Sequence, residues 1–490
     1  MVKSITKLCC LIAFICACKK DDPIPDPYAD VPKTGTRTEL TLDSIYLYAH
    51  ETWLWNDALP DYLTFNPRKF ANDGTTPAVY EKELSELLKY KVNPATGLPY
   101  EYAALQDNLK YSFLDEGNSE TGMLAQLSLT GYGDGYGFDA AQYMDALRVK
   151  YVYPESPAAL ANLHRGDKII AMGTSSVDNH LNMTVEKGDG SIINLNLLES
   201  SYTSSTIFKT KIITSGANSV GYLSIGQFVT KDILQPELEP IFQQFSTNNI
   251  RHLIVDLRYN SGGYVSSAEC LANFISPSNI SGKVMYTEHF NDQMQQGKAL
   301  ILQNQPYYNA AGEQVTINGR LATYLDVDYT VANNTYKFAK EGRLEDLEHV
   351  YFIVSGQTAS AAEMLINCLK PYLPVTLIGT TTYGKPVGFF TVHIDQYNLY
   401  LSSFQIKNAA HEGDYFEGFD ATIGAKDDLR YDFGDPREEC LAKTLELINK
   451  GISTLGSSKN NHLPPKLSAK RMSLKSYMPK MIEDRMKLKN

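Results

Sequence analysis

Cysteine is scarce in the part of this sequence that is expected to fold. Four of the seven cysteines lie in the first eighteen residues, which leaves Cys270, Cys368 and Cys440, and neither CxxC nor HExxH occurs. Metal ligation and a disulfide scaffold both need clustered or paired residues. We therefore expect no metal site and no obligatory disulfide, with the three thiols buried as small apolar residues in helices.

Basic charge and long apolar runs are also in short supply. The formal net charge is -11, so the surface is a poor match for phosphate backbones and we expect no nucleic acid partner. With 43% hydrophobic and 21% charged residues, the composition is that of a globular protein rather than a disordered or polytopic membrane protein. A chain of 490 residues exceeds one ordinary core, so we expect about two to four domains.

The first residues resemble a bacterial lipoprotein signal. Lys3 and Lys7 precede an apolar run from Leu8, which is about half of the roughly 20 residues that span a bilayer. Small residues then lead to Cys18, as in a lipobox. We therefore expect cleavage before Cys18, acylation of this cysteine and a membrane anchor without a spanning helix. An ordinary cleaved signal with incidental cysteines is the alternative.

The charged residues after Cys18 bear on location. The sequence from Lys19 to Asp22 is Lys-Lys-Asp-Asp, which resembles the segment that directs some lipoproteins of Bacteroides-type bacteria to the outer surface. The expected location is the cell envelope, as an outer-membrane lipoprotein that faces either the periplasm or the outside.

A glycine-rich loop stands ahead of a strand and a short helix. Gly135, Tyr136, Gly137 and Phe138 precede a strand-like stretch at 147–152, the sequence SPAAL and a Gly-Asp turn. This order resembles a PDZ domain, in which such a loop directs backbone N–H groups at the terminal carboxylate of a peptide that pairs with an open sheet edge. A plain turn is the alternative for the glycines. No helix follows the loop, as a nucleotide-binding loop would require.

Two further loops follow buried strands of an α/β region, where the active sites of such folds collect. The first runs from Asp256 to Gly263, and the second holds Ser360 at the start of a helix. Unpaired N–H groups and the dipole at a helix start favour negative charge, so an attacking hydroxyl there would find its oxyanion stabilised. The alternatives are a tight turn with an ion pair between Asp256 and Arg258, and a serine that only caps the helix.

A third loop, 378–386, ends on Gly384, Lys385 and Pro386. It matches six positions of a Walker phosphate loop, but Pro386 stands where that loop needs a Ser or Thr hydroxyl for magnesium. Lys385 can instead serve as general base toward Ser360, provided that burial lowers the pKa of its amine toward neutrality. None of the nine histidines has a setting that suggests a catalytic triad. We therefore expect a serine-lysine dyad.

These segments together resemble the carboxyl-terminal processing peptidases, also called tail-specific proteases. Residues 256–263 read DLRxNxGG, residues 358–363 read TASAxE, and Gly384-Lys385 also matches, so the resemblance covers roughly residues 120–436. It implies an α/β core similar to those of ClpP and crotonase, without a cofactor. It implies Ser360 as nucleophile and Lys385 as general base. The implied oxyanion hole consists of the backbone N–H of Ala361 and that of Gly262 or Gly263.

Two positions depart from the family pattern. Some members carry a glycine after the lysine and a glutamine four residues after it, where this chain has Pro386 and Phe389. The glutamine that would orient the amine is thus replaced, and the nearest substitutes are Thr358 or Glu363. The segment 285–348 is also longer than a minimal core requires, and we expect it to cap the cleft.

Composition and periodicity divide the chain as a whole. After the core comes a helix and then a tail that carries nine basic and two acidic residues from position 459 onward. We expect this tail to be a solvated end, and an arm that contacts anionic lipid or the acidic body is the alternative. The expected parts are a signal peptide 1–17, a tether 18–39, an N-terminal helical domain 40–118, a PDZ-like domain 119–212, a protease core 213–438 with the insertion 285–348, and a C-terminal helix with the basic tail 439–490.

The expected function is that of a serine endopeptidase of the cell envelope. It would capture unstructured carboxyl-terminal tails of other proteins in the PDZ-like groove and cleave them through an acyl-enzyme. The first alternative is a catalytically weak or inactive peptide-binding lipoprotein that serves as a scaffold. A carbohydrate-binding surface protein is the second alternative, with only the 32 tyrosines in its favour.

Overall fold

The computed structural model describes residues 28–102, 109–115, 125–174, 179–309, 312–450, 480–483 and 485–489. The expected signal peptide, Cys18 and the first part of the tether lie outside these residues, as does most of the basic tail. Within the described ranges, no helix has both the length and the apolar character needed to cross a bilayer.

A six-stranded sheet forms the centre of the molecule, and it confirms the expected α/β core. The first two strands pair antiparallel and all later pairs are parallel. The strand order is β10 (Ile207–Ser215), β11 (Asn218–Ile225), β12 (His252–Asp256), β18 (His349–Val354), β19 (Val375–Gly379) and β24 (Ile423–Gly424). Its inner strands are continuous apolar runs because helices cover both faces.

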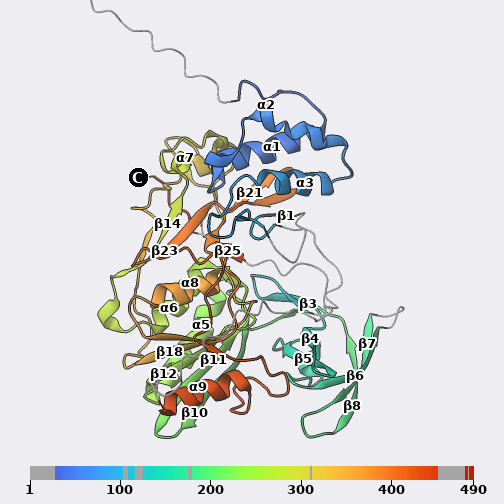
Figure 1. Ribbon diagram of the computed structural model, residues 1–490, viewed down its shortest axis with the longest axis vertical. Helices are drawn as coiled ribbons and strands as arrows, with labels where there is room; N and C mark the ends of the chain where they lie inside the picture. The colour runs from blue at the N-terminus through green and yellow to red at the C-terminus, as the bar shows by residue number, and fades with distance from the viewer. Residues whose placement is uncertain are drawn as a thin grey trace, which may run out of the picture.

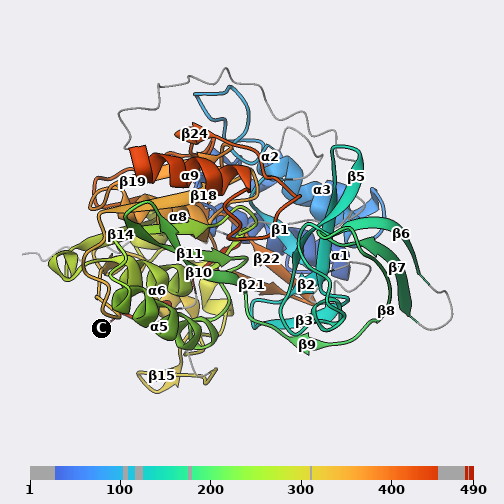
Figure 2. The same ribbon diagram turned by 90° about the horizontal axis from the view of Figure 1, so that it is seen from below.

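Helices cover the two faces of this sheet unequally (Figures 1 and 2). On one face, Leu223 and Val255 join the apolar cluster of three helices, whereas Tyr222 and Ile254 pack on the other face against a single helix. The alternation follows from the two-residue period of a strand. The three helices are α5 (Lys231–Thr247), α6 (Val265–Ile275) and α8 (Ala361–Leu369), and the single helix is α9 (Glu439–Lys450). The three cysteines are buried on these helices, as expected.

A second sheet draws on the segment 285–348. Its strand order is β17 (Thr335–Lys337), β14 (Val284–Phe290), β23 (Phe404–Asn408) and β20 (Val387–Gly388). The segment therefore contributes β14 at its start and β17 near its end to this sheet. The apolar alternation of β14 is interrupted by Glu288, which is nevertheless fully buried, and this interruption hid the strand from sequence analysis.

The N-terminal region packs on the core as part of the same apolar cluster. Its helices are α1 (Arg37–Thr52) and α3 (Ala78–Leu87), and β1 (Phe113–Asp115) pairs with β22 (Tyr397–Tyr400) beside β21 (Thr391–Ile394). The expected start of this domain at residue 40 lies within α1. Helix α1 begins at Arg37, since the Thr36 hydroxyl accepts a hydrogen bond from the Glu39 N–H and caps the helix.

Residues 125–203, here named the β-rich unit, lie beside the core and have an apolar cluster of their own. Five antiparallel strands form its main sheet, with a one-turn helix, α4 (Pro157–Leu160), between the second and third. The order is β4 (Phe138–Tyr143), β5 (Ala146–Val152), β6 (Lys168–Thr174), β7 (His180–Glu186) and β8 (Ile192–Leu198), and a smaller sheet holds β2 (Ala125–Leu127), β3 (Tyr132–Gly135) and β9 (Tyr202–Thr203).

Arg165 joins the β-rich unit to the core. Its guanidinium donates to the Tyr259 hydroxyl at 2.7 Å and forms an ion pair of 2.5 Å with Asp427. Asp427 also pairs with Arg258 at 2.8 Å. Although burial opposes ionisation, the two arginines hold the pKa of the Asp427 carboxyl below its usual range.

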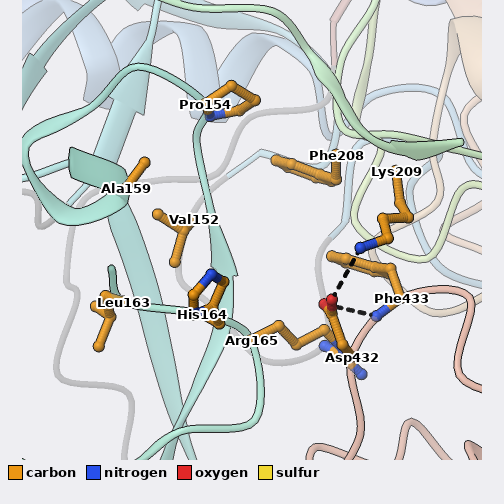
Figure 3. Close-up of a pocket in the computed structure, with 10 residues that line it drawn as sticks. All are labelled: Val152, Pro154, Ala159, Leu163, His164, Arg165, Phe208, Lys209, Asp432 and Phe433. Carbon is orange, nitrogen blue, oxygen red and sulfur yellow. Dashed lines mark hydrogen bonds and ion pairs between the residues drawn. The ribbon is translucent and has the colours of Figure 1, made fainter. Parts of the chain in front are cut away.

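A pocket opens at the same junction (Figure 3). Residues of the β-rich unit, of β10 and of the loop before α9 line it, and the ion pair between Lys209 and Asp432 closes one side. Neither Ser360 nor Lys385 belongs to its lining, so this pocket is not the site of the expected dyad.

Candidate active site

Ser360 stands immediately before helix α8 in a strained backbone conformation. Its φ of 64° and ψ of -118° lie outside the regions that side chains with a Cβ prefer. The residue is fully buried, and its hydroxyl oxygen has no hydrogen-bond partner among the described residues. Ser360 nevertheless occupies the N-cap position of α8 and forms a capping box with Glu363, so the alternative of a serine that caps the helix stands beside the predicted nucleophile. The strain and the unused hydroxyl are features typical of a reactive serine.

Lys385 is fully buried in the loop that follows β19. Its Nζ lies 3.5 Å from the carbonyl oxygen of Tyr111 and 4.0 Å from the centroid of the Phe389 ring. Tyr111 itself donates its hydroxyl to the Gly384 carbonyl at 2.7 Å. The N-terminal region therefore supplies part of the lysine's surroundings, which sequence analysis did not predict.

The Glu363 carboxylate holds the serine loop and the lysine loop together. One of its oxygens accepts hydrogen bonds from the backbone N–H of Ser360, at 2.9 Å, and of Lys385, at 2.8 Å. The other accepts from the Thr382 hydroxyl at 2.5 Å and from the Gly384 N–H at 2.7 Å. Burial raises the pKa of Glu363, and these four donors oppose the shift. The structure thus brings the backbone N–H groups of Ser360 and Lys385 to the same buried carboxylate oxygen.

The glycine loop that follows β12 lies against helix α8 and forms the short strand β13 (Gly262–Tyr264). The Gly262 N–H donates to the Asn260 side-chain oxygen at 2.8 Å. The Gly262 carbonyl and the Tyr264 N–H bond to the backbone of Phe228, at 2.9 Å each. Because backbone groups alternate along a strand, the N–H and carbonyl of Gly263 point to the opposite edge.

Gly263 must be glycine for steric reasons. Its φ is 138°, and a Cβ built on it would lie 2.0 Å from the Phe228 carbonyl oxygen. Of the two candidate oxyanion donors left open by the sequence, Gly262 has its N–H occupied by Asn260, whereas Gly263 directs its N–H away from Phe228. Ala361, the other candidate, is the first residue of α8, where N–H groups have no partner within the helix.

The position of the family glutamine is filled by Phe389, whose ring lies beneath the Lys385 amine. An aromatic face attracts a cation but accepts no conventional hydrogen bond. Of the two expected substitutes, Thr358 donates its hydroxyl to the Leu257 carbonyl at 2.7 Å, away from the lysine. Glu363 contacts the backbone of Lys385 and not its amine. The lysine is therefore positioned by its loop and by packing.

The predicted PDZ-like loop lies apart from this site, in the β-rich unit. Gly135 ends β3, and Phe138 begins β4, which forms one edge of the five-stranded sheet. The carbonyls of Tyr136 and Gly137 accept hydrogen bonds from the backbone N–H of Ala158, at 3.0 Å, and of Tyr153, at 2.8 Å. The loop is thus fixed by internal bonds, and a strand edge follows it.

Comparison with known proteins relates part of the chain to a peptidase family. Residues 219–406 match Peptidase family S41. The carboxy-terminal-processing protease of Bartonella bacilliformis is 25% identical over 169 residues, which are 34% of this chain and 29% of that protein. The chain thus matches less than a third of the length of this relative.

A solved structure with a TM-score above 0.5 has the same fold at low identity. A Bacteroides fragilis protein assigned to the S41 proteases has a TM-score of 0.54 and 22% identity, over 83% of this chain and 96% of the other. The photosystem II D1 C-terminal processing protease has a TM-score of 0.44 and 13% identity, over 80% and 93%.

The segment 219–406, which carries the buried serine and lysine on adjoining loops, matches the serine peptidases of family S41. Within that family, the chain is related to the carboxyl-terminal processing proteases.

We expect Glu363→Gln to lower activity through the position of the dyad. An amide offers one acceptor oxygen and one NH₂ group, so at least two of the four donors would lose their acceptor. Misplacement of reacting groups by about 1 Å costs on the order of 10²-fold in rate. The kcat for an unfolded protein should fall by about that factor with little change in KM.

The control for this variant is Glu51→Gln. Glu51 is also buried, and it accepts the Ile301 N–H at 2.8 Å on the far side of the N-terminal region. Both variants should lose stability by thermal unfolding, and only Glu363→Gln should lose kcat. An equal kcat for the two, measured well below either unfolding midpoint, would show that Glu363 is structural only.

Proposed function

We propose that the protein is a serine endopeptidase that cleaves other proteins near their carboxyl-terminal tails. The observation that supports this most directly is the Glu363 oxygen, which binds the backbone N–H of both Ser360 and Lys385 beside an unpartnered Ser360 hydroxyl. This arrangement is suited to a nucleophile and base that must stay close while the serine remains free to attack.

The proposed reaction starts with proton transfer from Ser360 to Lys385. Removal from water disfavours the charged ammonium, so burial favours the neutral amine that can accept this proton. The serine Oγ then forms a bond to the substrate carbonyl carbon, and the N–H groups of Ala361 and Gly263 stabilise the oxyanion. Collapse breaks the peptide bond, and Lys385 returns the proton to the departing amine. Water repeats the sequence on the acyl-enzyme and releases Ser360.

Substrate capture is assigned to the β-rich unit. A peptide tail would pair with the open edge of β4, with its carboxylate near the backbone of residues 135–138. The edge position of β4 and the fixed glycine loop support this PDZ-like role. We also propose that Cys18 carries the lipid anchor, which would keep the enzyme on the outer membrane of the cell envelope.

A fluorophosphonate probe tests the proposed chemistry. After prolonged incubation, the probe should modify a single serine, and peptide mapping by mass spectrometry should assign it to Ser360. The same preparation should hydrolyse an unfolded protein. Absence of both labelling and hydrolysis would favour the inactive peptide-binding protein instead.

A further inference from the structure

A strand from the basic tail lies in the candidate active site. Strand β25 (Lys480–Ile482) pairs in parallel with β13, so that Gly263 faces Met481. Figure 1 shows β25 in the middle of the molecule, above α8 and to the right of β23 in that view. The expectation that the tail is only a solvated end is therefore wrong for these residues, and the alternative of an arm on the body holds.

The edge of β13 that contacts β25 is the one with catalytic potential. Gly262 and Tyr264 use the other edge for Phe228, so the Gly263 N–H points toward the tail. In the proposed reaction this N–H must bind the oxyanion. A backbone N–H that is directed into a β-ladder is not available for a substrate oxygen at the same time.

The second edge of β25 pairs with the residue beneath the lysine amine. The Phe389 N–H donates to the Met481 carbonyl at 3.0 Å, and the Glu483 N–H donates to the Phe389 carbonyl at 3.3 Å. The tail therefore bridges the glycine loop and the lysine loop as an added strand. An extended substrate that is recognised by strand addition would use these same two edges.

Met481 supplies the apolar anchor of this strand. Its side chain is fully buried and belongs to the main apolar cluster of the core. Removal of this apolar side chain from water stabilises the docked strand. A peptide that replaced the tail would gain the same stabilisation with an apolar residue at this position and would lose it with a charged one.

Beyond Met481 the tail is held by polar groups. Arg485 pairs with Glu269 at 3.0 Å, and Lys487 donates to the Asn333 carbonyl at 2.7 Å. Glu483 is buried against Glu288, and oxygens of both carboxyl groups have no hydrogen-bond partner among the described residues. Burial and the neighbouring Glu483 raise the pKa of Glu288. The other Glu483 oxygen accepts the Arg485 backbone N–H at 2.7 Å, so the unpartnered oxygens of the two facing carboxyls are the unfavourable element of an otherwise well-docked segment.

We propose that residues 480–483 occupy the substrate-binding cleft as an intramolecular pseudosubstrate, and that the tail must leave before an extended peptide with an apolar residue at the Met481 position can bind. This inference rests on the proposed function. The contact is autoinhibitory because β25 covers the Gly263 N–H with one edge and bonds to the backbone of Phe389 with the other. If β25 stayed in this place permanently, the Gly263 N–H could never bind the oxyanion of a substrate.

The test uses the full chain with Met481→Glu, which puts a charge into the apolar site and should release the strand. Hydrolysis of an unfolded protein and probe labelling of Ser360 should both become faster by about 10-fold or more, the factor that corresponds to 1.36 kcal/mol. Arg485→Ala, which removes the ion pair with Glu269, should give a smaller increase. The control Leu63→Glu changes an exposed leucine of the N-terminal region and should leave the rates unchanged.

A synthetic peptide of residues 478–489 provides the second measurement. It should bind to the Met481→Glu chain and inhibit it, whereas the same peptide with Glu in place of Met481 should not. Unchanged rates in both tail variants, or loss of cooperative unfolding in both, would overturn the inference and make β25 a structural strand.

Competition binding separates this inference from the proposed chemistry. The 478–489 peptide is labelled with a fluorophore for this measurement. If neither the wild type nor the tail variants hydrolyse protein, displacement of this peptide by an unfolded protein would support the pseudosubstrate assignment while the peptidase proposal fails. Binding of the peptide without such displacement would overturn the assignment, whatever the activity.

Discussion

Replacement of Ser360 by alanine should abolish hydrolysis while it preserves or raises stability. Loss of the nucleophile of a serine peptidase lowers kcat by about 10⁴-fold or more. The Ser360 hydroxyl is buried without a hydrogen-bond partner, and such a group costs about 1–3 kcal/mol. The alanine variant is therefore expected to unfold at an unchanged or higher temperature, in the wild-type chain and in the Met481→Glu chain alike.

The matched control is Ser276→Ala. Ser276 is also fully buried, but its hydroxyl donates to the Asn273 carbonyl at 3.1 Å. This change should lower the unfolding temperature and keep the activity, which is the opposite of the result expected at Ser360. Undiminished turnover of the Ser360→Ala protein would remove the proposed mechanism.

Replacement of Lys385 should be nearly as damaging, and arginine should not rescue it. A positioned general base contributes about 10²–10⁴-fold to the rate. Lys385→Met retains a long apolar side chain for packing over the Phe389 ring but offers no amine. Lys385→Arg retains the charge, and a guanidinium does not lose its proton in proteins. Both variants should lose hydrolysis and probe labelling by this factor.

Lys340→Met serves as the control for the loss of a half-buried amine. Lys340 donates to the carbonyls of Phe274, at 3.3 Å, and Leu344, at 2.8 Å, away from the serine loop. Its replacement should affect stability alone. If Lys385→Arg retained full activity, a base other than the lysine would have to accept the serine proton.

Much of the core could be predicted because its signals are local. Continuous apolar runs predict buried parallel strands, and the small-residue loops after them predict where the site lies. Ser360 stood out by its place before a helix, although the same place fits a cap. The tertiary contacts bear on this choice, because the Glu363 carboxylate bonds to the lysine loop and the serine hydroxyl has no hydrogen-bond partner among the described residues.

Other parts of the site could not be predicted, because they depend on contacts between residues far apart in the sequence. The choice between Gly262 and Gly263 depends on where the Asn260 side chain and the Phe228 backbone lie. Strand β25 covers only three residues, too short for a periodic pattern, and its stability comes from the two edges that it joins. The contribution of Tyr111 to the lysine's surroundings likewise follows from packing of the N-terminal region.

The ion pairs of Asp427 have a consequence for how much of a substrate's carboxyl-terminal tail is removed. Separation of the β-rich unit from the core would leave the buried Arg165 guanidinium without the partly exposed Asp427 carboxylate, and a buried charge without its partner is unfavourable. This contact therefore opposes separation of the two parts. Under the proposed function, a substrate tail bound at β4 reaches Ser360 over a fixed distance. The number of residues between the end of the substrate and the cleaved bond is then fixed as well.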